Sequence, residues 1–221
     1  MKTIQQIYNE YEIAPFLQLH MLRVAGVAGV IADNFEEKLD KENILSACLL
    51  HDIGNTVKFN IEFTGKQDWA KGVDMEKLRE YQARLISRYG QDEHNATYGI
   101  CAEIGVSERV MFLVKTIGFS HSCGNLQSQD FAAKICGYAD GRVTPEGIVS
   151  LAERLAEGHR RYRANKNITH PVAADGEFAK LFNCAMALEK QIFAKCKIKP
   201  EDIAEEKARP LIKSLLMFEI V

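Results

Sequence analysis

Residues 44–54 read Ile-Leu-Ser-Ala-Cys-Leu-Leu-His-Asp-Ile-Gly, an apolar run that ends in two adjacent side chains able to bind a metal ion. Apolar residues stand at helical offsets from both His51 and Asp52, so a helix over this run would point both groups toward a core. Burying a carboxylate is costly unless a charge partner is present. The stretch therefore predicts a helix that carries ionisable groups inward, where a divalent cation would offset the cost.

Four more ionisable side chains show the same placement on a helical apolar stripe. They are His20, His94, His121 and Asp140. One metal site would explain these four together with His51 and Asp52. Its donors would be nitrogen and oxygen without a thiolate, which disfavours a structural zinc cluster and suits Fe, Mn, Co, Ni or catalytic Zn.

Apolar spacings of three and four residues recur along almost the whole chain, while alternating β-branched runs are nearly absent, which predicts an all-α fold. We expect helices near residues 2–12, 15–35, 42–53, 74–89, 92–104, 107–118, 128–142, 145–165, 173–195 and 200–218. Pro15 and Pro200 suit the first turn of a helix, and Gly90 suits a helix end. Residues 54–73 lack a clean period and are predicted to form a loop beside the site, either a lid or an ordinary connector.

The 221-residue chain has a formal net charge of −2 and a pI near 6.3, which gives no general attraction to nucleic acid or to an anionic membrane. Its six cysteines are widely spaced and form no Cys-x-x-Cys pair, which favours reduced core thiols and a reducing compartment. Residues 1–30 lack the features of a signal peptide, and no stretch is expected to reach the length of a membrane span. We therefore expect a cytoplasmic protein that binds neither nucleic acid nor a membrane.

The candidate ligands follow one another in the order His, His-Asp, His, His, Asp, and Ile53-Gly54 follows the His-Asp pair. Over roughly residues 15–165, this pattern resembles the HD superfamily of metal-dependent phosphohydrolases. The resemblance implies an HD-domain helical bundle with the metal site at its centre. The residues that match the family's first metal site are His20, His51, Asp52 and Asp140, with Asp52 as the bridging carboxylate. His94 and His121 match the extra histidines of members that hold two metals, although a one-metal site in which both contact substrate is left open.

We expect the HD domain to span residues 1–170, with its core at about 15–165. Residues 171–221 are predicted to form a C-terminal helical extension that packs on the same domain. The apolar stripes of this extension must be covered, either by that domain or by a second copy of the chain in a homodimer.

The resemblance implies hydrolysis of a phosphoester or phosphoanhydride in a small molecule of the nucleotide class, by a metal-activated hydroxide. One or two divalent metal ions would be the cofactor. Asp52 would hold the metal, and Arg23 or Lys58 would balance the charge that develops on the phosphorylated substrate.

Asn55 departs from the family pattern, because many HD proteins carry a lysine at this place that suits a phosphate. This departure keeps a second class open, the diiron HD oxygenases, which use the same ligand set with dioxygen. A third possibility is a non-catalytic protein that binds a nucleotide or a metal. Oxygen consumption separates the second class from the first, because a hydrolase consumes none.

Overall fold

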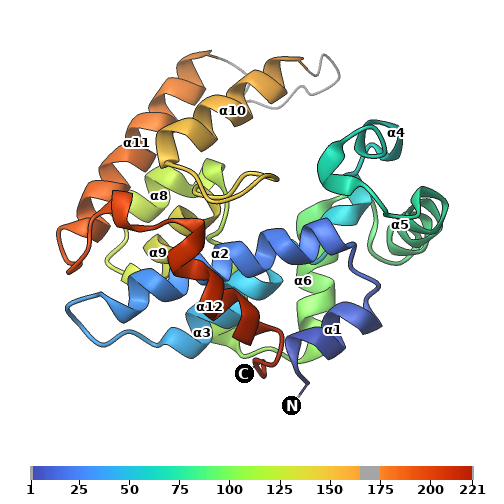
Figure 1. Ribbon diagram of the computed structural model, residues 1–221, viewed down its shortest axis with the longest axis horizontal. Helices are drawn as coiled ribbons and strands as arrows, with labels where there is room; N and C mark the ends of the chain where they lie inside the picture. Colours follow the sequence, from blue (N-terminus) through green and yellow to red (C-terminus); the bar gives the residue numbers. More distant parts are fainter. Residues whose placement is uncertain (1, 165–174, 221) are drawn as a thin grey trace.

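The computed structural model describes residues 2–164 and 175–220, and the regular structure of these residues is helical, with isolated β-bridges in place of strands. The all-α prediction is confirmed. Figure 1 shows the helices, whose bounds are α1 Ile4–Glu10, α2 Pro15–Asp33, α3 Lys41–Leu50, η1 Asn55–Lys58, α4 Ile61–Thr64, η2 Asp68–Ala70, α5 Met75–Tyr89, α6 Glu93–Ile104, α7 Glu108–Val114, η3 Phe119–His121, α8 Ser122–Gln127, α9 Phe131–Asp140, α10 Leu151–Ala164, α11 Asp175–Phe193, η5 Pro200–Asp202 and α12 Glu205–Leu215.

Side-chain caps fix where several of these helices begin. Asp74, Asp92, Ser107 and Asp130 each accept a hydrogen bond from a backbone amide in the first turn of α5, α6, α7 and α9. Such a cap satisfies one of the four amides that the first turn leaves without a helical partner. The predicted start at residue 128 therefore moves to Phe131, because Asp130 is the cap.

Several expected helices are shorter than predicted, and three of them bear on the site. The helix expected over 42–53 ends at Leu50, so His51 and Asp52 lie in the turn after α3 and not inside it. The helix expected over 107–118 ends at Val114, and α8 follows where none was predicted. The helix expected from Pro145 begins only at Leu151, because residues 143–148 form a tight turn closed by a Val143–Ile148 bridge.

Residues 54–73 are more regular than the predicted loop. They contain η1, α4 and η2, and Gln82 of α5 donates hydrogen bonds to the carbonyl oxygens of Thr56 and Phe59, both at 2.8 Å. Trp69 packs edge-on against Phe16 of α2, with ring centroids 4.9 Å apart. The segment is therefore tied both to α5 and to the start of α2.

Helix α2 lies at the centre of the fold and packs against α3, α9 and α12. By length and composition this 19-residue helix could cross a membrane, contrary to the expectation from the sequence, but 56% of the apolar window is buried inside the protein. It has the apolar composition of a core helix. Gly26 and Gly29 let α12 approach closely, because a Cβ at Gly29 would lie 2.3 Å from Leu211 Cδ2.

The C-terminal helices pack on the rest of the chain: α11 contacts α8 and α9, and α12 contacts α2. The two ends of the chain lie side by side, since the amides of Ile4 and Gln5 donate to the carbonyl oxygens of Phe218 and Leu216, both at 2.9 Å (Figure 1). The expected domain boundary at residues 170/171 falls within 165–174, outside the described residues.

The prediction that all six cysteines are reduced is wrong for one pair. Cys123 of α8 and Cys184 of α11 form a disulfide across 61 residues of sequence. The other four cysteines are thiols. Cys48, Cys101 and Cys136 are buried, and Cys196 is partly buried. Wide spacing in sequence does not reveal a disulfide, because only the packing of α8 on α11 brings the two sulfur atoms together.

Candidate metal centre

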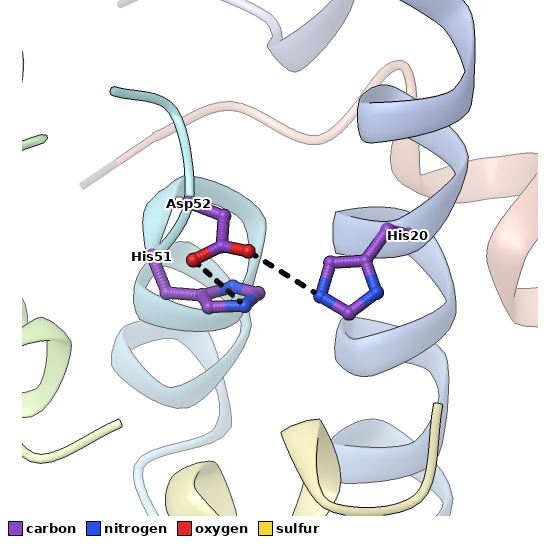
Figure 2. Close-up of side chains that lie close together, drawn as sticks. All are labelled: His20, His51 and Asp52. Carbon is purple, nitrogen blue, oxygen red and sulfur yellow. Dashed lines mark ion pairs between the residues drawn. The ribbon is translucent and has the colours of Figure 1, made fainter. Parts of the chain in front are cut away.

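Three of the helices around the centre of the fold each bring a ligand-type side chain to one place. His20 projects from α2, His51 caps the C-terminal end of α3, Asp52 follows in the next turn, and Asp140 is the last residue of α9. Figure 2 shows the imidazole of His20 facing the carboxylate of Asp52, with the imidazole of His51 beside it. The ligand atoms of His20, His51 and Asp52 all lie within 4.8 Å of one another.

The distances within this cluster are those of groups arranged around an ion. His20 Nε2 lies 3.6 Å from Asp52 Oδ2 and 3.3 Å from Asp140 Oδ1. His51 Nε2 lies 3.7 Å from Asp52 Oδ1 and 3.6 Å from Asp140 Oδ1. Ligand atoms about 2.1 Å from a shared ion would be separated by about 3.0–3.4 Å in octahedral or tetrahedral geometry. The four side chains are therefore spaced close to what a divalent ion requires.

The orientation of His51 leaves one ring nitrogen for a ligand. Its Nδ1 lies 2.8 Å from the carbonyl oxygen of Cys48, so Nδ1 carries the proton and donates it. Its Nε2 is buried and has no hydrogen-bond partner among the described residues. An orphaned buried polar atom is costly, and a bound metal ion would satisfy it. The Cys48 carbonyl was not anticipated from the sequence, although the last turn of every helix offers such unpaired carbonyls.

The opposite charges within the cluster stabilise the ionised forms of His51 and Asp140. Burial lowers the pKa of His51, but the carboxylates of Asp52 and Asp140 outweigh burial and raise this pKa to about 9. Burial likewise raises the pKa of Asp140, but the imidazoles of His20 and His51 outweigh it and hold the pKa well below its usual range. Without a metal ion the imidazolium of His51 supplies positive charge beside these carboxylates.

Gly54 brings α6 against the turn that holds His51 and Asp52. Its amide donates to Thr97 Oγ1 at 3.1 Å, and a Cβ at this position would lie 2.3 Å from the Thr97 backbone nitrogen. Only a residue without a side chain allows this approach. The glycine after the His-Asp-Ile sequence therefore positions the helix whose first turn carries His94.

His94 and His121 are both exposed, so the prediction that they point inward is wrong. His94 stacks with Tyr98 one turn along α6, at a centroid distance of 6.1 Å. Burial and, to a smaller extent, the charge of His94 lower the pKa of His121. Among the described residues, neither belongs to the group whose ligand atoms lie within 4.8 Å of one another.

The two basic residues proposed to balance substrate charge form other contacts. Arg23 is paired with Glu205, with Nε and Oε1 3.1 Å apart, and its side chain is only 12% exposed. Lys58 is half exposed, and its Nζ lies 3.1 Å from Glu93 Oε1 at the start of α6. Arg23 is therefore committed to the structure, whereas the Lys58 side chain is half exposed and paired with Glu93.

A protein-family model described as HD domain matches residues 18–94. The match contains His20, His51, Asp52 and His94, and it ends before His121 and Asp140. Neither the curated proteins nor the solved structures gave a significant match. HD domains bind divalent metals, in agreement with the cluster of two histidines and an aspartate found within the matched residues. Residues 18–94 of the chain therefore match an HD domain, and this match supports membership of the HD-domain superfamily.

Proposed function

We propose that this protein is a metal-dependent phosphohydrolase that cleaves a phosphoester or phosphoanhydride bond in a small molecule of the nucleotide class. The observation that carries the proposal is the set of imidazole–carboxylate distances of 3.3–3.7 Å that join His20 and His51 to Asp52 and Asp140. The buried Nε2 of His51, which has no hydrogen-bond partner among the described residues, belongs to this set. Membership of a family whose members are usually hydrolases supports the same reaction class.

The chain's own residues hold and orient the metal site. The Cys48 carbonyl fixes the ring of His51, and the two oxygens of Asp52 face the two imidazoles from one side. Asp140 closes the site from α9. A divalent ion held by these residues would supply a nucleophilic water near neutral pH and polarise a phosphoryl oxygen. Fe, Mn, Co, Ni and Zn all suit this donor set.

His94 and His121 are assigned to the substrate side of the site. Both are exposed, so they can contact a phosphate or a second ion. Lys58 is assigned to substrate charge, because its side chain is half exposed and its ammonium pairs with Glu93, the residue that precedes His94. Arg23 receives no catalytic role, since its guanidinium is engaged elsewhere.

The first experiment measures metal content by elemental analysis in the wild-type protein and in Asp52→Ala, after expression with Fe, Mn and Zn. Asp68→Ala, a change at an exposed aspartate of η2, is the control. We expect one or two equivalents in the wild type and in the control, and loss of metal in Asp52→Ala. Full metal content in Asp52→Ala would overturn the site assignment.

The second experiment identifies the reaction. Metal-loaded protein is screened with phosphorylated nucleotides for release of phosphate or pyrophosphate, and the iron-loaded protein is assayed in parallel for oxygen uptake under reducing conditions. Hydrolysis that is lost in Asp52→Ala and retained in Asp68→Ala supports the proposal. Oxygen uptake without phosphate release would move the protein to the diiron oxygenases.

A further inference from the structure

Three segments that are far apart in sequence meet through polar contacts around the metal cluster. They are helix α2, which carries His20, the turn at residues 143–148, which follows Asp140, and the start of α12 at Glu205. The HD-domain match covers only the first of them. Through these contacts the C-terminal segment is joined to the segments that carry or follow ligands of the metal cluster.

Arg23 ties α2 to the turn. It lies three residues after His20, so the two side chains stand one helical turn apart on neighbouring positions of α2. Its Nη1 and Nη2 donate to the carbonyl oxygens of Pro145 and Glu146, at 3.1 and 3.2 Å. The planar guanidinium fork therefore binds two successive carbonyls in the middle of the turn.

Glu205 binds both α2, through Arg23, and the turn at residues 143–148, through Ile148. One carboxylate oxygen accepts from Arg23 Nε at 3.1 Å, and the other accepts from the amide of Ile148 at 3.3 Å. The turn itself is closed by hydrogen bonds between the backbones of Thr144 and Gly147. The turn follows Asp140 by three residues and is closed by its own hydrogen bonds, so a contact that fixes it relative to α2 also restrains the end of α9.

A second arginine ties the same C-terminal segment to α9. Arg142 lies two residues after Asp140 and is buried, with 3% of its surface exposed. Its guanidinium donates to the carbonyl oxygens of Ile203 at 3.1 Å and Pro200 at 3.3 Å. Residues 200–205 therefore contact both Arg23, one helical turn after His20, and Arg142, two residues after Asp140.

We infer that Glu205 is a positioning residue for the metal centre, which acts through Arg23 and the turn at 143–148 to set the spacing of His20 and Asp140. This inference rests on the proposed function, because it needs the cluster to bind a metal. Partners that orient metal ligands from outside the coordination sphere typically contribute 10–100-fold in metal affinity. The C-terminal segment would thus be part of the site and not only a cover for the core.

The test compares Glu205→Gln, Arg23→Gln and the matched control Glu206→Gln, an exposed neighbour of Glu205 on α12. The dissociation constant for Mn²⁺ and for Zn²⁺ is measured by competition with a chromophoric chelator. We expect Glu205→Gln and Arg23→Gln each to weaken metal binding by about 10–100-fold. We expect Glu206→Gln to bind as the wild type does.

The sign of the two effects separates positioning from simple charge. Removing the Glu205 carboxylate withdraws negative charge from the surroundings of a cation, whereas removing the Arg23 guanidinium withdraws positive charge. A long-range charge effect would therefore weaken binding in one variant and strengthen it in the other, and this result would overturn the inference. Arg23→Lys, which keeps the charge without the planar fork, is expected to behave like Arg23→Gln.

Thermal unfolding of the metal-free variants separates positioning from general stability. If Glu205→Gln lowers the melting temperature but leaves the metal dissociation constant unchanged, the inference fails while the proposed function stands. If the wild type binds no metal, the proposed function fails and the inference fails with it. Weakened binding in both variants, with a wild-type constant in Glu206→Gln, supports the positioning role.

Discussion

The chain carries two groups of candidate ligands that look alike in sequence and differ in the structure. The inner group, His20, His51, Asp52 and Asp140, converges to distances of 3.3–3.7 Å at the centre of the fold. The outer pair, His94 and His121, is exposed. In the sequence, residue type and order predict a metal ligand equally in the inner group and in the outer pair.

The difference lies in the elements that carry the two groups. The inner ligands stand on α2, on the end of α3 and on the end of α9, which pack directly on one another in the main core. The outer pair stands on the first turn of α6 and on the 3₁₀ helix η3, at the edge of that core. Ligands converge where the helices that carry them pack directly on one another, because this packing directs their side chains to a common place.

The largest expected effect comes from removing an inner ligand. Asp140→Ala should weaken metal binding by more than the roughly 10–100-fold that an outer-sphere partner contributes, and should abolish turnover, because both imidazoles lose a facing carboxylate. His94→Ala should keep the inner ion. Chelator competition measures both constants. Equal losses in the two variants would break the distinction between inner and outer ligands.

The next effect concerns the disulfide beside the outer pair, since Cys123 follows His121 by two residues. Loss of a crosslink that spans 61 residues is expected to lower the free energy of unfolding by about 4 kcal/mol at most. Urea unfolding with and without reductant measures it, with the double variant Cys123→Ser/Cys184→Ser as a check. Cys196→Ser serves as the control. An unchanged midpoint would mean that the two thiols are reduced in the protein.

Two glycine substitutions compare the packing beside the inner ligands, at Gly54, with the packing beside the outer pair, at Gly124. Gly54→Ala places a Cβ 2.3 Å from the Thr97 backbone nitrogen and should lower the free energy of unfolding by about 1–3 kcal/mol, since backbone has to move. Gly124→Ala in α8 meets nothing within 4 Å and should be neutral or stabilise by up to about 1 kcal/mol. Chemical unfolding of both variants checks this. A neutral Gly54→Ala would contradict the close approach of α6.

The smallest effect concerns the start of α9, opposite the end that carries Asp140. The hydrogen bond from Arg109 lowers the pKa of Asp130, against the opposing effect of burial, with help from the amides of Ala133 and Ala132. This ion pair therefore contributes stability above about pH 4, the usual Asp pKa, and loses it as the pH falls through the lowered value.

Asn also caps helices well, so Asp130→Asn should remove only the ion pair and cost less than about 1 kcal/mol at pH 7, because the pair is partly exposed. Unfolding of the wild type and the variant is followed from pH 7 to pH 2. The difference between them should shrink toward low pH. A difference that grows as the pH falls would contradict the lowered pKa.

Much of the fold was predictable because helices follow local rules. The period of the apolar residues predicted the helices that became α2, α5, α6 and α11 within a few residues, and Pro15 stands in the first turn of α2 as predicted. The errors fall where tertiary contacts override the local signal. Helix α8 and the short helices of residues 54–73 were missed because they are too short to show a period.

The site was predictable in part for a similar reason. Apolar residues stand at helical offsets from His20 and from the His51-Asp52 pair. These nearby residues were enough to predict that the three side chains point inward. His121 has no such neighbourhood, because α7 ends at Val114 and the offsets that seemed to bury it do not lie on a continuous helix. The pairing of Arg23 could not be predicted because its partner, Glu205, lies 182 residues away.

The sequence by itself determined the all-α class, the central apolar helix, the His-Asp turn and the choice of nitrogen and oxygen donors, since these depend on residue type and on spacings within a few helical turns. Only the tertiary structure decided which ligands converge, which cysteines pair, and that Glu205 and Arg142 tie the C-terminal segment to the site. These features join residues across 61 to 182 positions of the chain or bring separate helices together, and no local spacing encodes them. They follow from the way α2, α3, α9 and α12 pack, which places distant side chains within a few ångströms of one another.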